Sequence, residues 1–407
     1  MLRKMSGLVF VLGLMLAAVP AMADFTPVTL LTTIGVPSAG PGINPNPGGA
    51  FTAFDISFVD PVTGRYYLAD RSNAAVDIFA GETFLGRTAS VFTGQQPTTA
   101  TSGPNGILTV NNGSFHTLFA GDGDSTLKSF NISSLGLPPP QQFSPLNTGG
   151  VFRVDQMSYS PSADLVLVGN NADSPAFVTL VNASTGLAVY SHIVMPGAFS
   201  GVGQSVWNPN TNSFFISVPQ FGTTGPGGVA EIHVDGTVGR IYDLSTFGIS
   251  SCAPIGLALG ASGNLVVGCT NANTQTVVLN PTGSGAIVKT FAGISGANEI
   301  WYDPTSAAFY LTGLSGGGRV FDVIDDLSLN ILQSVSLPNV NAHSIAVDPG
   351  NGFVYVPLPG GIANTLNPDG CVAVYGPAPV PEPTTILLLG SGLVGLAGYG
   401  RKKFFKK

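Results

Sequence analysis

The polar residues that could do chemistry in this chain of 407 residues recur at one position of a repeated segment. Each lies at, or directly beside, the position five residues before a turn rich in Asp, Asn, Pro, Ser and Gly. The set consists of Asp55, Asn105, Asp155, Gln204, Asn298 and His343. Carboxylate and amide oxygens are the ligands that Ca²⁺ and similar hard cations prefer. If the fold gathers these side chains at one mouth, a divalent cation or another ligand could bind there.

A plainer interpretation of the same residues stays open. Polar residues at the starts of strands that face a channel satisfy water and cap backbone groups without holding a ligand. The fifth repeat also has Ile255 where a ring of metal ligands would need an oxygen atom. We therefore favour a solvated mouth without a cofactor over a Ca²⁺ or other divalent-cation site.

Other motifs with a possible chemical meaning are better interpreted as turns. Asp122-Gly123-Asp124 begins like a calcium loop but lacks the bidentate Glu of such a loop. Residues 313–317 fit G-x-S-x-G, but strands flank them on both sides, whereas a nucleophile elbow needs a following helix. The sequence thus predicts no catalytic residue, and an enzyme is the less favoured interpretation.

The three cysteines are Cys252, Cys269 and Cys371. The first two flank one hairpin, so a disulfide between them is conceivable in an exported protein. The expected hairpin register places Cys269 opposite Gly256, four residues away from Cys252. This register favours unbonded thiols and leaves the disulfide open.

The N-terminus has the pattern of an export signal. Arg3 and Lys4 precede the apolar residues 7–19, and Ala21 and Ala23 supply small side chains at a cleavage site before residue 24. Residues 1–23 are therefore predicted to be a cleaved secretory signal peptide. An uncleaved membrane anchor is the alternative.

The C-terminus has three parts in a fixed order. Pro381, Glu382 and Pro383 come first, then the apolar residues 384–400, and then a basic tail that begins with Arg401, Lys402 and Lys403. Seventeen apolar residues in a helix span about 25 Å, which is enough for a thin bilayer. A basic tail is expected to stay cytoplasmic.

Residues 378–407 resemble the PEP-CTERM sorting signal. The resemblance implies a Gram-negative bacterium that makes exopolysaccharide, and an exosortase that recognises Pro381, Glu382 and Pro383. It also implies export through Sec and a transient stay in the inner membrane. Release to the periplasm, the cell surface or the exterior would follow. A plain membrane anchor is the alternative.

Charge excludes one class of partner. Between residues 24 and 380 there are eight Lys and Arg against 21 Asp and Glu, so the body carries about −13. Binding to nucleic acid needs clustered basic residues. We expect no nucleic-acid partner.

The body contains seven similar segments, each with two short apolar strands around a polar turn. They are residues 54–70, 106–121, 155–170, 204–219, 255–269, 298–313 and 343–358. A third strand follows every segment, and a fourth is expected after five of them. Four strands per 40–50 residues are typical of a propeller blade. The pattern predicts an all-β body over residues 24–377.

This body resembles seven-bladed β-propellers of the YVTN, NHL and WD40-like kind. Residues 25–36 form a strand with no hairpin of its own, and we expect them to complete the seventh blade. A pair of β-sandwiches is the alternative architecture.

These features predict an exported, exosortase-processed propeller that acts as a binding or structural protein. Exopolysaccharide or other surface proteins would be its partners. The resemblance to propellers leaves one alternative, a metal-dependent, lactonase-like hydrolase or lyase at the channel mouth.

Overall fold

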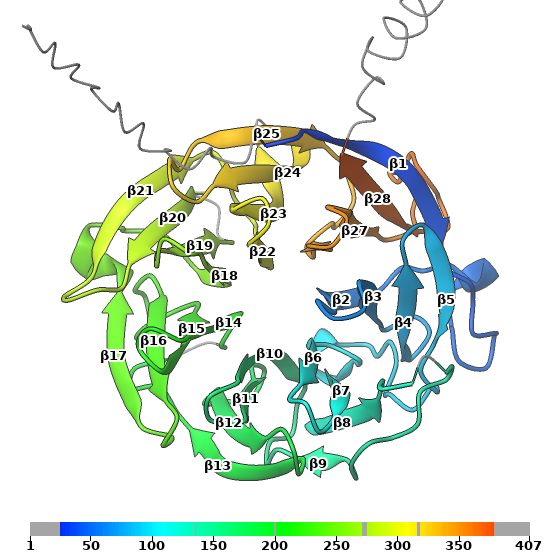
Figure 1. The fold of residues 1–407 in the computed structure, drawn as a ribbon, viewed down its shortest axis with the longest axis horizontal. Helices are drawn as coiled ribbons and strands as arrows, with labels where there is room; N and C mark the ends of the chain where they lie inside the picture. The colour runs from blue at the N-terminus through cyan, green and yellow to red at the C-terminus, as the bar shows by residue number, and fades with distance from the viewer. Residues whose placement is uncertain (1–24, 135, 199–200, 271–274, 316–317, 378–407) are drawn as a thin grey trace, which may run out of the picture.

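The computed structural model describes residues 25–377, apart from 135, 199–200, 271–274 and 316–317. These residues form seven four-stranded antiparallel sheets arranged as the blades of a ring (Figure 1). The predicted all-β, seven-bladed propeller is confirmed. The predicted signal peptide, sorting motif and membrane helix lie outside the described residues.

Six blades follow one another along the chain, each with strands in sequential order from the centre outwards. Blades one to three consist of β2 (Phe54–Val59), β3 (Arg65–Asp70), β4 (Ala75–Ala80), β5 (Thr83–Arg87), β6 (Ile107–Asn111), β7 (His116–Gly121), β8 (Thr126–Asn131), β9 (Leu146–Asn147), β10 (Val154–Ser160), β11 (Leu165–Asn170), β12 (Phe177–Asn182) and β13 (Leu187–Ile193). Blades four to six consist of β14 (Ser205–Asn208), β15 (Ser213–Val218), β16 (Gly228–His233), β17 (Val238–Asp243), β18 (Pro254–Leu259), β19 (Leu265–Cys269), β20 (Gln275–Asn280), β21 (Ala286–Ala292), β22 (Ile300–Asp303), β23 (Ala308–Ser315), β24 (Gly318–Asp325) and β25 (Ile331–Ser336).

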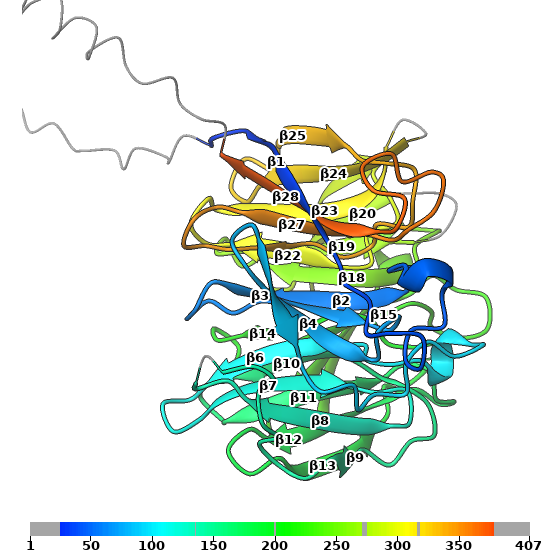
Figure 2. The same cartoon turned by 90° about the vertical axis from the view of Figure 1, so that its right-hand side faces the viewer.

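The seventh blade joins the two ends of the described chain. Its strands are, from the rim inwards, β1 (Val28–Gly35), β28 (Cys371–Pro377), β27 (Val354–Leu358) and β26 (Ala346–Val347). The pairing of β1 with β28 runs from Val28 opposite Pro377 to Gly35 opposite Cys371, and Figure 2 shows the two strands side by side. The expected closure by the N-terminal strand is confirmed, and β1 covers the edge that β28 would otherwise expose at the rim.

Apolar side chains are buried between blades rather than in one central core. Seven hydrophobic clusters each join two neighbouring blades. Middle strands such as β11 and β15 are buried at every residue because both of their faces pack against a neighbour. The rim strand β13 is exposed at six of its seven residues. This difference explains why middle strands are apolar runs while rim strands are mixed.

Helical structure in the described residues is confined to short 3-10 turns, η1 (Pro47–Gly49), η2 (Thr99–Thr101) and η3 (Leu244–Phe247). None of the described segments is a helix with the length and hydropathy that a membrane crossing requires.

Cys252 and Cys269 form a disulfide, which the expected hairpin register did not favour. A β-bulge between Pro254 and Gly256 shifts the pairing, so that Cys269 lies opposite Pro254 rather than Gly256. The two Cα atoms are therefore only 4.9 Å apart. Cys371 is a buried free thiol.

Candidate functional site at the channel mouth

Innermost strands β2, β6, β10, β14, β18 and β22 surround the centre of the ring (Figure 1). Asp55 lies on β2 and Asp155 on β10, each at the start of its strand. Both positions fall within a register shift, between Phe54 and Ser57 and between Val154 and Met157. A bulge re-aims side chains that strict alternation would place on a sheet face.

A network of charged and polar groups joins the first two blades at this mouth. The Nη2 of Arg71, which follows β3, donates a hydrogen bond to Asp55. The Nε and Nη2 of Arg71 also donate to Oδ1 of Asn105, at 2.9 and 2.6 Å. All three side chains are buried. Arg71 thereby links a carboxylate of blade one to an amide that precedes β6 in blade two.

Arg153 connects the third blade to the same carboxylate. Its Nη2 lies 3.1 Å from Oδ2 of Asp155, and its Nη1 lies 3.6 Å from Oδ2 of Asp55. Its Nε donates to Oδ1 of Asn171 at 3.1 Å. The guanidinium of Arg153 is thus the cation that separates the two carboxylates.

His343 approaches Asp55 from the seventh blade. Its Nε2 lies 3.7 Å from Oδ1 of Asp55, and its Nδ1 is 2.9 Å from the carbonyl oxygen of Asn341. The imidazole stacks on Phe54, with ring centroids 4.3 Å apart. These contacts fix the ring with one edge towards the carboxylate.

The environment sets different pKa values for the two carboxyls. Burial acts to raise the pKa of Asp55, but Arg71, the nearby imidazole of His343 and Arg153 outweigh it and hold that pKa well below its usual value. Burial raises the pKa of Asp155 to about 6, against the opposing charge of Arg153. The Oδ1 atom of Asp155 is buried without a hydrogen-bond partner.

The remaining two predicted residues have other surroundings. Gln204 accepts hydrogen bonds from the backbone N–H groups of Leu257 and Ile300 and donates to the carbonyl of Ile300. It therefore ties the innermost strands of blades four, five and six together. Asn298 is half-buried directly before Glu299.

Glu299 is a buried acid that the predicted set did not include. One of its oxygens accepts hydrogen bonds from the hydroxyl of Ser344 and from the backbone N–H of Ile345 and Ser57, the latter two at 3.3 and 3.5 Å. Burial raises its pKa to about 8, so the acid is mostly neutral at pH 7. A protonated acid thus joins blades six, seven and one.

Arg71 and Arg153 are the other residues that sequence reasoning missed. A signal was present, because the body has only eight basic residues and Arg153 stands two positions before Asp155. The donor set does not fit a divalent cation well, since guanidinium groups already neutralise Asp55 and Asp155. Among the described residues, no three His, Cys, Asp or Glu side chains form a group that could hold a metal ion.

Fold and channel together define the class of the protein, a closed seven-bladed β-propeller with a charged mouth. Residues 379–402 match the PEP-CTERM protein-sorting motif. The chain therefore carries the predicted sorting motif, which includes Pro381, Glu382 and Pro383. The motif implies an exported protein that is processed by exosortase and anchored in a membrane only transiently.

Comparison with solved structures supports the fold alone. A chain in the crystal structure of the mitotic checkpoint complex aligns with a TM-score of 0.61 at 13% identity, over 92% of this chain and 99% of that chain. In all, 1263 chains of solved structures match, so the fold is too common to select a function. No curated protein sequence matches this chain significantly.

Proposed function

We propose that this protein is an exported propeller that works as a binding or structural protein at the cell surface or in the exopolysaccharide matrix. The observation that carries the proposal is the sorting motif at residues 379–402. The ring closes through β1 and β28, which ends at Pro377, before the motif begins. Removal of the tail would leave every described blade intact, as a processed cargo requires.

The charge of the body limits the partners that it can bind. About −13 over residues 24–380 keeps the propeller soluble and repels anionic polymers such as nucleic acid. The geometry does not favour the alternative hydrolase or lyase, because Arg71 and Arg153 occupy the carboxylates that its metal would need.

Processing of the tail can be tested in a bacterium that has an exosortase. We expect the wild-type chain to appear outside the inner membrane without residues 401–407, as measured by mass spectrometry of the released protein. Glu382→Ala should remain in the inner membrane, while Glu82→Ala, which removes an exposed acid of the body, should be released normally. Released protein with an intact C-terminus would refute the proposal.

A further inference from the structure

A cavity of about 420 Å³ lies along the channel and extends from the level of Gln204, beside the charged mouth, to that of Trp301 and Tyr302. Residues from the innermost strands of blades one to six line it. Its aromatic members, called the aromatic pocket below, are Phe58, Tyr159, Trp207, Trp301 and Tyr302. Phe58 and Tyr159 lie three and four residues after Asp55 and Asp155, which is about 10–13 Å further along each strand. The aromatic residues therefore lie further along the channel than the charged mouth.

The rings of the aromatic pocket are held in place by their neighbours. Trp301 packs edge-to-face on Phe58 with centroids 5.1 Å apart, and Trp207 packs in the same way on Phe214 at 4.8 Å. All five aromatic side chains of the pocket are only half-buried. All five residues line the cavity, and the ring contacts restrict the orientations of Phe58, Trp207 and Trp301 before any ligand arrives.

Some residues that line the same cavity carry polar groups without a described partner. The amide of Gln156 and the indole N–H groups of Trp207 and Trp301 make no hydrogen bond with any described residue, and these atoms are not sealed from solvent. Glu299 at the cavity wall is mostly uncharged at pH 7. The lining therefore combines flat apolar faces with neutral hydrogen-bonding groups.

We infer that the aromatic pocket binds a neutral saccharide of one or two hexose rings, an inference that deepens the proposed function and rests on it. A hexose presents C–H groups on one face, which pack on aromatic rings, and hydroxyls at its edge, which would pair with Gln156 and the indole N–H groups. A purely apolar ligand would leave these donors buried without partners. An acidic sugar would meet the strong negative charge of the body.

The tryptophans give a direct measurement, because both Trp residues of the protein lie in this pocket. Intrinsic Trp fluorescence of the full chain, purified in a detergent without a sugar headgroup, should change on addition of neutral mono- and disaccharides. The panel should cover gluco, galacto, manno and N-acetylated types at millimolar concentration. No change with any member would overturn the inference, as would tighter binding of glucuronic acid or of an apolar dye.

Substitutions locate the binding site within the channel. By calorimetry, Trp301→Ala should weaken saccharide binding about three- to tenfold, and Trp301→Phe should weaken it less. Tyr190→Ala removes an exposed aromatic ring on the rim strand β13 and should leave affinity unchanged. Equal loss in the Tyr190 variant, or full affinity in the well-folded Trp301→Ala variant, would place the sugar elsewhere and overturn the inference. Correct tail processing together with a negative panel would remove this inference and leave the proposed function standing.

Discussion

At the scale of single residues, the channel contains buried acids, and burial makes their ionisation unfavourable in free energy. Glu299 contacts Ser344 and the backbone of Ser57 and Ile345, so it bridges three blades around the axis. Burial raises its pKa from the usual 4.5 to about 8. Because the raised pKa belongs to the folded state, this group stabilises folding most below pH 4.5, and that advantage falls as pH rises through 8.

Glu299→Gln copies the protonated acid and should remove this pH dependence. We expect equal stability of variant and wild type near pH 4. Above it, the variant should become progressively more stable than the wild type as pH rises to the folded-state pKa. Urea unfolding at pH 4, 6 and 9 measures the difference. Glu82→Gln, at an exposed site, should keep the wild-type slope. A Glu299 variant that is less stable than wild type at pH 9 would contradict the assignment.

Asp155→Asn tests whether the mouth holds a metal ion. Asp155 already has one unpaired buried oxygen and shares Arg153 with Asp55, so loss of its charge should be neutral or slightly stabilising at pH 8. The shift in melting temperature should be the same in calcium and in chelator, and the exposed Asp124→Asn serves as control. A decrease seen only with calcium would restore the metal interpretation.

At the scale of elements, the β18–β19 hairpin shows how one bulge changes a covalent bond. The bulge between Pro254 and Gly256 brings Cys269 within reach of Cys252, and the bond closes a loop with a sequence separation of 17. Chain entropy assigns such a loop about 3 kcal/mol of stability.

Replacing Cys252 and Cys269 together by Ser should therefore lower the free energy of unfolding by about 3 kcal/mol. A reducing agent should lower the melting temperature of the wild type to that of the double variant and leave the variant unchanged. If the reducing agent does not change the melting temperature of the wild type, the disulfide contributes little to stability.

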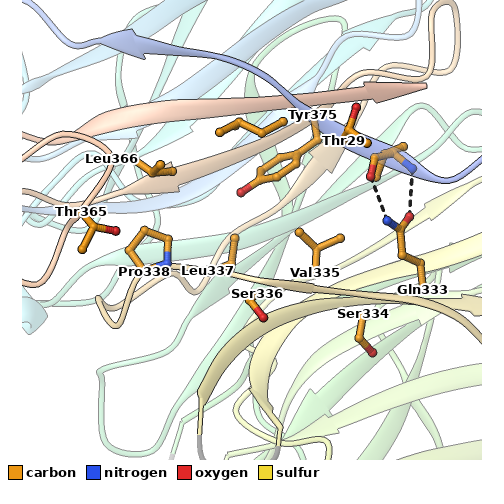
Figure 3. Close-up of a pocket in the computed structure, with 12 residues that line it drawn as sticks. Thr29, Gln333, Ser334, Val335, Ser336, Leu337, Pro338, Thr365, Leu366 and Tyr375 are labelled. Atoms are coloured by element: carbon orange, nitrogen blue, oxygen red, sulfur yellow. Dashed lines mark hydrogen bonds between the residues drawn. The ribbon is translucent and has the colours of Figure 1, made fainter. Parts of the chain in front are cut away.

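At the scale of the whole molecule, stability depends on closing the ring. Both faces of every blade are buried only when the seven blades form a closed circle. The strand β1 supplies the rim strand of the seventh blade. Gln333 on β25 of blade six forms two hydrogen bonds with the first residue of β1. Its amide donates to the carbonyl of Val28 at 2.8 Å and accepts from the N–H of Val28 at 2.9 Å (Figure 3).

Deletion of residues 25–36 should leave β28 with an open edge, because the seven backbone pairs from Val28 to Gly35 are lost. We expect aggregation by light scattering and a large decrease in melting temperature. Gln333→Ala removes only the two side-chain hydrogen bonds to Val28 and should lower the free energy of unfolding by only about 1 kcal/mol. Wild-type melting of the deletion variant would show that closure by β1 is unimportant.

Local patterns in the sequence were enough to predict the seven blades, the closing strand and the sorting motif. Alternating apolar residues, turn clusters and a motif are readable within short windows, because they reflect backbone geometry and recognition of a contiguous segment. The gathering of Asp55 and Asp155 also follows from their equivalent places in repeats.

The tertiary structure decided which groups the side chains at the channel mouth contact. Arg71 reaches Asn105 of the next blade, and Arg153 reaches Asp55 across two blades, contacts that depend on bulges and on how neighbouring sheets are rotated. The disulfide depends in the same way on one extra residue in β18. A bulge changes which face a side chain takes, and no pattern of period two records it. For this reason the sequence alone predicted a propeller with a polar channel, while only the fold determined that arginines neutralise its mouth.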